Sequence, residues 1–261
     1  MKDGAAAAHD LDQDAIDAYR RDGFCVIEDV FAPAALTALR EAVDAAVEAE
    51  DTGRAPAEKD AYERLFDQKV DIRRRHPAVE AAADLARLGA LAAALEGHPM
   101  RVWHDQALYK RPGLGANDTP WHQDAVYWPH RDRWRQTTIW IALEDATEAN
   151  GCMSFVPGSH ALGPLDPVPL EKPTDLFAKA PALREVVPQA RPLRAGSATF
   201  HNGLTWHAAG ANGTGRTRKA FAVIFMPEAT RYTGAPHVVT DPMGLVPGAP
   251  FPDAQFPRLG S

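Results

Sequence analysis

The chain has 261 residues, of which 45% are hydrophobic and 24% charged, and its formal net charge is −7 at pH 7. This composition is typical of a globular protein with a substantial core, organised as one large domain or two small ones. The acidic balance and the lack of an extended basic block argue against a nucleic-acid partner, and no apolar stretch is long enough to span a membrane. Two cysteines do not make a disulfide framework, so we expect a cytoplasmic protein.

The N-terminal segment is expected to begin without regular structure. Residues 1–10 are predicted to be a disordered leader, since charged residues flank their alanine run and no apolar core of signal-peptide character follows. A short helix is then predicted from Asp12 to Asp22, ended by Gly23. The apolar run at residues 24–27 that follows predicts a strand.

Two longer helices are expected next. Pro33 opens the first at a position where its missing N–H costs nothing, and apolar residues recur at helical spacing at positions 36, 39, 43 and 47. Residues 51–60, rich in glycine, proline and charge, are predicted to form a loop. An alanine-rich helix is then predicted from Pro77 to Glu96, ending at Gly97.

After Pro99, short runs of β-branched and aromatic residues alternate with turn residues, which predicts strands over 102–110, 137–144, 152–156, 197–201, 204–208 and 216–226. Asn150-Gly151 predicts a hairpin between the second and third of these. From Thr233 onward, frequent proline and glycine predict an irregular surface tail. This order indicates one α+β, mainly β domain over 11–261, with a helical flank (11–98), a sandwich or barrel core (99–230) and a tail (231–261).

Trp121-His122-Gln123-Asp124 carries the first candidate site. In an extended segment, His122 and Asp124 point to the same side because strand side chains alternate between faces. An imidazole and a carboxylate on one face are two of the three ligands of the 2-His-1-carboxylate site that holds non-haem Fe(II). The site still needs a second histidine, for which His207 and His201 compete.

Arg218 favours His207 over its competitor. A turn about Asn212–Gly213 would fold two predicted strands into a hairpin and place His207 opposite Arg218. A metal-bound histidine beside a guanidinium suits an anionic co-substrate that binds both the metal and the arginine. Arg216, nearer the turn, is the alternative anchor. Arg218 is expected to face the interior, since its strand face also carries Ala220, Ala222 and Ile224.

With these residues, the chain resembles the phytanoyl-CoA dioxygenase family of Fe(II)/2-oxoglutarate oxygenases. The resemblance runs from Tyr19 to about Met226, and its most specific pieces are 121–124, the run 148–160, and Trp206-His207 followed by Arg218. It implies a double-stranded β-helix (jelly-roll, cupin-like) core with flanking N-terminal helices. It also implies that Fe(II) is bound by His122, Asp124 and His207, and that Arg218 binds the distal carboxylate of 2-oxoglutarate, with O2 as the oxidant.

The resemblance implies further contacts in the pocket. Trp140, Gln106 and Lys69 match co-substrate contacts of the family. Trp140 could equally be a core residue and Lys69 a surface lysine. Lys110, on the same strand face as Gln106, is a weaker alternative contact. Relatives that hydroxylate small polar metabolites carry a tryptophan at the place of Trp128, so Trp128 and its neighbour Tyr127 are expected to form a pocket wall.

The predicted function is that of a 2-oxoglutarate-dependent dioxygenase that hydroxylates an unactivated C–H bond of a small molecule, releasing succinate and CO2. The presence of Asp124 favours hydroxylation, desaturation or ring chemistry over halogenation, because related halogenases lack this carboxylate. The expected substrate is a specialised metabolite or an amino-acid-like compound. Residues 125–135, dense in aromatic and cationic side chains, form either a lid over an anionic or aromatic substrate or a solvated loop. The alternatives are a cupin-like metal-dependent isomerase or lyase that does not use 2-oxoglutarate, and a non-catalytic metal-binding module.

Overall fold

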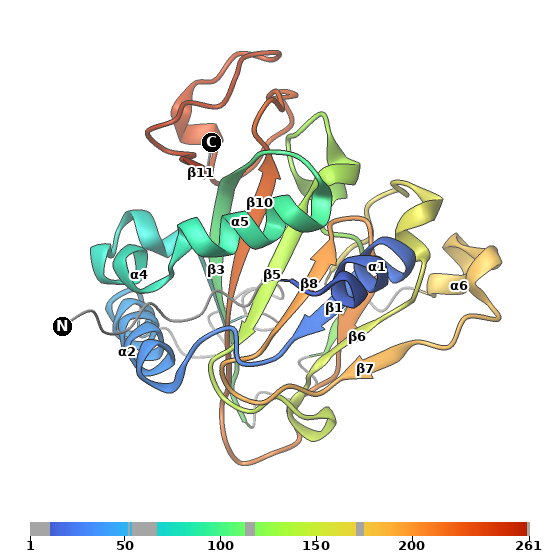
Figure 1. Ribbon diagram of the computed structural model, residues 1–261, viewed down its shortest axis with the longest axis horizontal. Coiled ribbons are helices and arrows are strands. Elements are labelled where there is room, and N and C mark those ends of the chain that lie inside the picture. The colour runs from blue at the N-terminus through green and yellow to red at the C-terminus, as the bar shows by residue number, and fades with distance from the viewer. Residues whose placement is uncertain (1–10, 52, 54–66, 113–117, 171–174, 260–261) are drawn as a thin grey trace.

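The computed structural model describes residues 11–51, 53, 67–112, 118–170 and 175–259, so the predicted leader 1–10 and most of the predicted loop 51–60 lie outside the described residues. Two antiparallel β-sheets form the core, and helices of the N-terminal part cover the outer face of the larger sheet (Figure 1). Within the described parts, no helix is both long and apolar enough to cross a membrane.

The larger sheet has seven strands. They lie in the order β1 (Phe24–Ile27), β8 (Ala198–Asn202), β5 (Thr137–Ala142), β10 (Arg218–Pro227), β3 (Met100–Lys110) and β11 (Arg258–Leu259), and β2 (Asp67–Val70) also pairs with β3. The smaller sheet has the order β4 (Thr119–His122), β9 (His207–Ala209), β6 (Met153–Phe155) and β7 (Gln189–Arg191). This arrangement is the predicted mainly β, double-stranded β-helix core with flanking helices.

The first two helices, α1 (Gln13–Asp22) and α2 (Pro33–Ala49), lie where the sequence predicts them. The Asp12 side chain caps α1 by accepting a hydrogen bond from the backbone N–H of Ala15 at 2.7 Å, and Gly23 ends the helix with a φ of 84°. The apolar face of α2 is buried, as its periodicity predicts, through Leu36, Leu39, Val43 and Val47.

The single helix predicted from Pro77 to Glu96 is wrong. The chain forms two helices instead, α4 (Pro77–Ala82) and α5 (Leu85–Glu96). Between them Asp84 adopts a left-handed φ of 48°, and its carboxylate accepts a hydrogen bond from Arg87 at 2.7 Å. The hydrophobic periodicity continues on both sides of Asp84, so it does not reveal that this one residue leaves the helical conformation. α5 ends at Gly97, as predicted.

The hairpin predicted at Asn150-Gly151 is also wrong, because β5 and β6 belong to different sheets. Asn150 instead ends a 3₁₀ turn, Glu148–Asn150, and its side chain accepts a hydrogen bond from the backbone N–H of Thr147 at 2.7 Å. Gly151 has a φ of 85° and passes close to Gly210, whose carbonyl oxygen would lie 2.3 Å from a Cβ at position 151. The dipeptide therefore redirects the chain from one sheet to the other.

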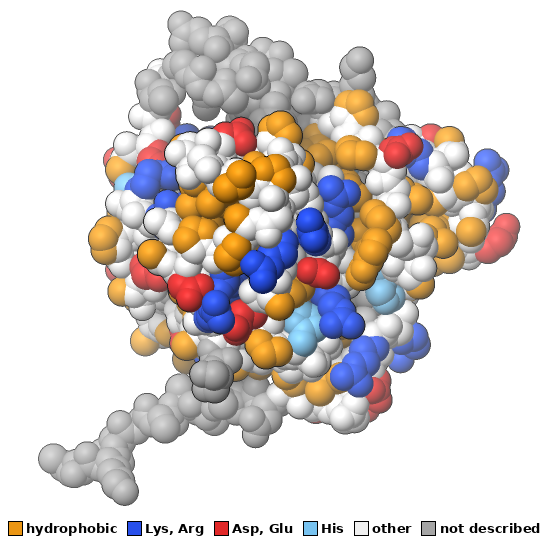
Figure 2. All heavy atoms as spheres, turned by 90° about the horizontal axis from the view of Figure 1, so that it is seen from above, with side chains coloured by type: hydrophobic (Ala, Val, Ile, Leu, Met, Phe, Trp, Pro, Cys, Tyr) orange, Lys and Arg blue, Asp and Glu red, His pale blue; other side chains and the backbone are white. Residues whose placement is uncertain are grey.

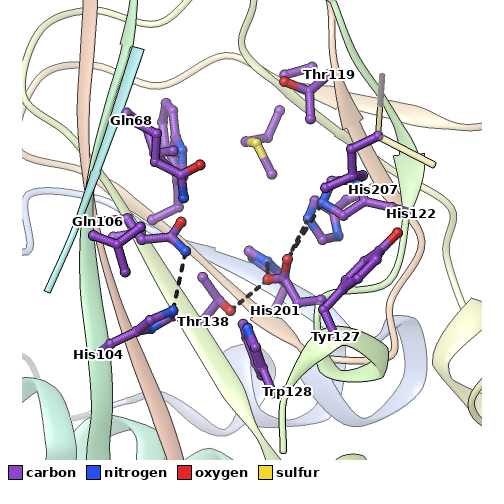
Figure 3. Close-up of a pocket in the computed structure, with 18 of the residues that line it drawn as sticks. Gln68, His104, Gln106, Thr119, His122, Tyr127, Trp128, Thr138, His201 and His207 are labelled. Atoms are coloured by element: carbon purple, nitrogen blue, oxygen red, sulfur yellow. Dashed lines mark hydrogen bonds and ion pairs between the residues drawn. The ribbon is translucent and has the colours of Figure 1, made fainter. Parts of the chain in front are cut away.

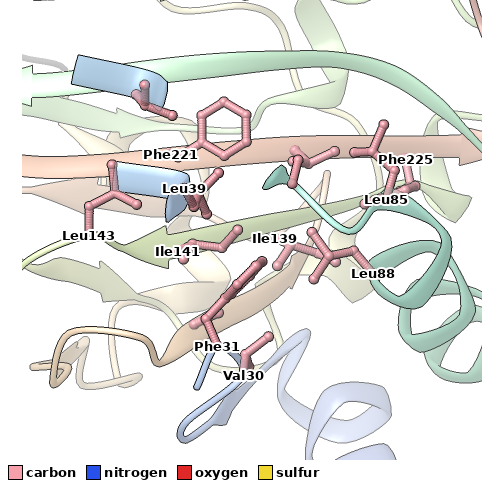
Figure 4. Close-up of a cluster of buried hydrophobic side chains, with 14 of the residues drawn as sticks. Val30, Phe31, Leu39, Leu85, Leu88, Ile139, Ile141, Leu143, Phe221 and Phe225 are labelled. Carbon is pink, nitrogen blue, oxygen red and sulfur yellow. The ribbon is translucent and has the colours of Figure 1, made fainter. Parts of the chain in front are cut away.

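Alternation along β5 and β10 separates two hydrophobic clusters. Phe221 and Phe225 of β10 and Ile139 of β5 pack against helical residues such as Leu39 and Leu88 on the outer face of the larger sheet (Figure 4). The intervening residues, including Trp140, Ala220, Ala222 and Ile224, face the smaller sheet. Seen from above, the surface mixes basic, acidic and hydrophobic side chains (Figure 2). The space between the sheets is where the candidate site residues meet.

Gly23→Ala is expected to lower the free energy of unfolding by about 3 kcal/mol, because an alanine there is strained and its Cβ would overlap Thr205 and His160. Gly97→Ala is the matched control, since Gly97 also ends a helix with positive φ but no atom lies within 4 Å of its added Cβ. It should cost only about 1 kcal/mol. Equal losses for both variants in urea denaturation would contradict the close packing at Gly23.

Candidate active site

The pairing of β4 with β9 brings together the two histidines that were predicted to be metal ligands. His122 lies opposite His207 in the antiparallel register, and the two ring centroids are 4.2 Å apart. Asp124 does not continue an extended strand, as the sequence interpretation assumed, because β4 ends at His122 and Asp124 has helical dihedrals at the start of a 3₁₀ turn. That turn nevertheless directs the carboxylate toward both histidines. His122 and His207 lie side by side at the cavity (Figure 3).

These three side chains form the one group of potential metal ligands found among the described residues, with ligand atoms all within 4.8 Å of one another. Nε2 of His122 and Nε2 of His207 each lie 3.5 Å from Oδ1 of Asp124. Nδ1 of each ring faces a backbone carbonyl oxygen, that of Pro120 at 2.7 Å or Thr205 at 2.9 Å. A carbonyl only accepts hydrogen bonds, so each Nδ1 carries the proton and each Nε2 offers a lone pair. Two imidazoles and a carboxylate presented in this way fit Fe(II).

The second carboxylate oxygen of Asp124 is held by two other residues. Oδ2 accepts a hydrogen bond from Thr138 Oγ1 at 2.9 Å and faces Nε2 of His201 at 3.4 Å. His201, the competing third ligand, therefore lies in the site but contacts the carboxylate oxygen that faces away from the other two histidines. Burial alone would raise the pKa of Asp124, but the contacts of its carboxylate with His207, His122 and His201 outweigh burial and hold the pKa well below its usual range. The carboxylate is thus ionised and oriented.

The predicted hairpin pairing of His207 with Arg218 is wrong. β9 pairs with β4 and β6 in the smaller sheet, whereas β10 pairs with β3 and β5 in the larger one, and Arg218 lies opposite Lys110. The chain between them crosses from one sheet to the other. Both side chains nevertheless line one cavity of about 470 Å³ between the sheets, together with His122 and Asp124.

Arg218 provides a fixed positive charge in this cavity. Its side chain is 3% exposed, its Nη1 donates to the carbonyl of Leu108 at 3.0 Å, and its guanidinium lies 5.2 Å from the centroid of the Trp140 ring. Nε has no hydrogen-bond partner among the described residues. Burial lowers the pKa of Arg218 to about 10, so it stays cationic at pH 7. Such a group requires an anion, and the distal carboxylate of 2-oxoglutarate fits it. Arg216, the alternative, is exposed.

Lys110 places a second cationic group beside Arg218. Its Nζ donates to the carbonyl oxygens of Ala209 at 3.0 Å and Gly210 at 2.7 Å, which follow His207 closely in the chain. Burial, followed by the charge of Arg218, lowers the pKa of Lys110 to about 7. This amine therefore changes charge near neutral pH.

The other predicted pocket residues divide into two groups. Trp140, Gln106, Tyr127 and Trp128 line the cavity, as does Lys110. Lys69 does not, because β2 turns its neighbours Gln68 and Val70 toward the cavity instead. Sequence reasoning missed the contacts of Thr138 and His201 with Asp124, although the strand alternation that placed Thr138 beside Trp140 was visible. It also missed the lining residues His104 and His237. The alternation of the predicted strand 102–110 puts His104 on the face of Gln106, whereas His237 lies in the predicted irregular tail and had no such signal.

The fold and this site together resemble those of jelly-roll proteins of the non-haem iron, 2-oxoglutarate-dependent class. Residues 19–220 match the family model described as phytanoyl-CoA dioxygenase, and the chain belongs to that family. Phytanoyl-CoA dioxygenase domain-containing protein 1 of Danio rerio is 32% identical over 127 residues, which cover 46% of this chain and 42% of the relative. The protein of the same name from Mus musculus is 31% identical over 153 residues, covering 56% and 50%. The matched segments thus span about half the length of these relatives.

Solved structures extend the similarity to nearly the whole chain. The non-haem alpha ketoglutarate dependent carbocyclase SnoK from nogalamycin biosynthesis superposes with a TM-score of 0.83 at 29% identity, covering 99% of this chain and 100% of SnoK. The epimerase SnoN, in complex with Fe3+, alpha ketoglutarate and nogalamycin RO, has a TM-score of 0.79 at 28% identity, covering 95% and 98%. The donors found between the sheets fit the iron and keto acid that SnoN holds.

Thr138→Val is expected to weaken Fe(II) binding about ten- to hundredfold, because it removes the hydroxyl that orients Asp124 while keeping the side-chain shape. Fe(II) affinity would be measured anaerobically by competition with a chelator. Thr199→Val is the matched control, since the Thr199 hydroxyl is buried without a hydrogen-bond partner among the described residues. The same affinity in both variants would argue against the orienting role.

Raising the pH from 6.5 to 8.5 is expected to weaken 2-oxoglutarate binding to the Fe(II)-loaded protein about three- to tenfold. Lys110, with its pKa lowered to about 7, is charged below that pH and neutral above it, so its attraction for the anion is lost as the pH rises. Calorimetry should show a weaker and flatter dependence for Lys110→Met. An unchanged slope in that variant would assign the effect to another group.

Proposed function

We propose that this protein is an Fe(II)- and 2-oxoglutarate-dependent oxygenase that hydroxylates an unactivated C–H bond of a small molecule of specialised metabolism, releasing succinate and CO2. One observation carries the proposal: the His122–Asp124–His207 group and the buried guanidinium of Arg218 open into the same cavity. A metal-dependent isomerase or lyase that does not use 2-oxoglutarate has no use for that guanidinium.

The roles follow from the coordination chemistry. His122, Asp124 and His207 would hold the iron and leave it accessible to the keto acid and to O2. When bound, these groups supply the oxidising chemistry. The chain's own residues fix the geometry: Thr138 holds the Asp124 carboxylate, and Arg218 receives the far end of the keto acid beside Trp140.

The substrate class is supported by two kinds of relative. SnoK and SnoN belong to nogalamycin biosynthesis, and this chain covers nearly the whole length of each. The ectoine dioxygenase of Sphingopyxis alaskensis, whose named substrate is amino-acid-like, is 28% identical over 151 residues. A cavity of about 470 Å³ is in the usual range for sites that enclose small molecules. A natural product is favoured over an amino-acid-like compound, because the SnoK similarity extends over the whole chain.

A second reaction on the same site is ring closure or epimerisation of the substrate. It is favoured by the names of the two neighbours, a carbocyclase and an epimerase. Both reactions would use the same iron ligands and the same keto acid, so the product distinguishes them. Mass spectrometry separates them: hydroxylation adds one oxygen atom, oxidative ring closure removes two hydrogen atoms, and epimerisation leaves the mass unchanged.

The test begins without oxygen. Fe(II) plus 2-oxoglutarate should give a visible metal-to-ligand charge-transfer band, and Arg218→Ala should require about a hundredfold more 2-oxoglutarate to reach it, because a buried charged hydrogen bond is lost. Arg216→Ala, at the exposed alternative, should titrate like the wild type. In air, a metabolite panel is then screened for stimulated succinate release, which Asp124→Ala should abolish. Near-normal succinate release by Asp124→Ala would overturn the proposal.

A further inference from the structure

The cavity has two chemically different ends. Arg218 and Lys110 lie opposite each other at one end, where β10 pairs with β3. His104 lies six residues before Lys110 on β3, roughly 20 Å further along the strand at about 3.3 Å per residue. Figure 3 shows His104 and Gln106 across the cavity from His122 and His207. We call the part lined by His104, Trp128, Pro236, His237 and Val238 the histidine end.

The histidine end lies beside the metal ligands. Ile224 of β10 is paired with His104 on one side and with Thr138 on the other, and Thr138 holds the Asp124 carboxylate. His104 therefore lies level with Thr138, two strands away across the larger sheet. With a keto acid anchored by Arg218, a substrate would approach the metal ligands from this side.

An aromatic support fixes the two histidines. The Trp103 ring lies 5.3 Å from His104 and 5.0 Å from His237 between ring centroids, and 5.3 Å from Phe256 of the C-terminal segment. His237 also accepts a hydrogen bond at Nδ1 from the backbone N–H of Val239 at 3.2 Å. The imidazole proton of His237 therefore sits on Nε2, which is left as a donor.

The histidine end carries no net charge at neutral pH. Burial lowers the pKa of His237 to about 4 and that of His104 well below its usual range, the latter with a further contribution from His237. Each ring then has one donor and one acceptor nitrogen. His104 is 1% exposed, its Nδ1 has no hydrogen-bond partner among the described residues, and its Nε2 has only the Gln106 amide nitrogen at 3.4 Å. Its hydrogen-bonding capacity is largely unused.

Cationic side chains do not reach this end within the described part of the chain. Arg131, Arg133 and Arg135 follow Tyr127 and Trp128 closely, but only the two aromatic residues line the cavity. The lysine and arginine that do line it, Lys110 and Arg218, are at the other end. The charge of an anionic substrate would therefore be buried against neutral imidazole and aromatic rings, with no cationic side chain at this end to compensate it.

We propose that His104 and His237 are the substrate-recognition residues of this enzyme: they hydrogen-bond to a hydroxyl or carbonyl group of an uncharged, ring-containing substrate that lies against Trp128. They thereby select neutral ring compounds over anions such as acyl-CoA thioesters. This inference rests on the proposed function, because it concerns the substrate of the same metal site. It adds the chemical class of that substrate and two residues that read it.

The experiment uses the enzyme loaded anaerobically with Fe(II) and 2-oxoglutarate, so that binding is measured without turnover. Binding is followed by quenching of tryptophan fluorescence and by perturbation of the charge-transfer band. The probes are a panel of neutral hydroxylated or keto ring compounds that includes estriol and chrysophanol, with phytanoyl-CoA as the anion. At least one neutral compound should bind about tenfold or more tightly than phytanoyl-CoA. His104→Phe and His237→Phe should each weaken its binding about three- to tenfold.

The controls separate recognition from folding and from the metal site. His98 lies outside the cavity, so the His98→Phe variant should bind the neutral compound like the wild type. His104→Gln and His237→Gln retain hydrogen-bonding groups and should recover part of the affinity, which a purely structural role would not produce. Tighter binding of phytanoyl-CoA, no binding of any neutral compound, or unchanged binding by both phenylalanine variants would overturn the inference. Failure of the wild type to form the charge-transfer band would instead overturn the proposed function.

Discussion

The site depends on one strand pairing, that of β4 with β9. It places His122 against His207 so that both Nε2 atoms face the same carboxylate oxygen, and it ends just where the chain turns to deliver Asp124. The larger sheet then supplies what the smaller cannot. Thr138 and His201 of that sheet contact the second carboxylate oxygen of Asp124. The group of candidate metal ligands is therefore held in place only when the two sheets lie face to face.

The cationic and the neutral titratable side chains lie at opposite ends of the cavity. The cations are paired across β3 and β10, where a dicarboxylate can use them, whereas the far end carries imidazoles that burial keeps neutral. Desolvation acts in the same direction on every one of these bases. Its consequence differs with the group: Arg218 stays charged because its ordinary pKa is so high, Lys110 moves close to neutrality, and the histidines lose their charge altogether.

Much of the fold was visible in the sequence because local signals agree with the tertiary structure. The capped α1, the proline-initiated α2 and the alternating strands β5 and β10 all lie close to their predicted positions. Errors arose where a local signal served another purpose. Asn150-Gly151 has hairpin chemistry but carries the chain between sheets, and Asp84 breaks a helix whose periodicity continues beyond it.

The site shows the same limit. The sequence interpretation placed His207 beside Arg218 through a hairpin that does not exist. The two side chains instead line one cavity because the two sheets face each other. His104 and His237 are far apart in the sequence, and their neighbours come from three distant segments. Only the packing of those segments on Trp103 reveals them.

The C-terminal segment after β10 was expected to be a surface tail, yet Pro236, His237 and Val238 form part of the cavity wall. The family match ends at residue 220, after the last residue assigned to the iron or the keto acid. Of the residues proposed to recognise the substrate, His104 and Trp128 lie within the family match, whereas His237 lies beyond it. Substitutions at Pro236, His237 or Val238 would reshape one wall of the cavity without touching a predicted iron ligand, which offers a route to new acceptors.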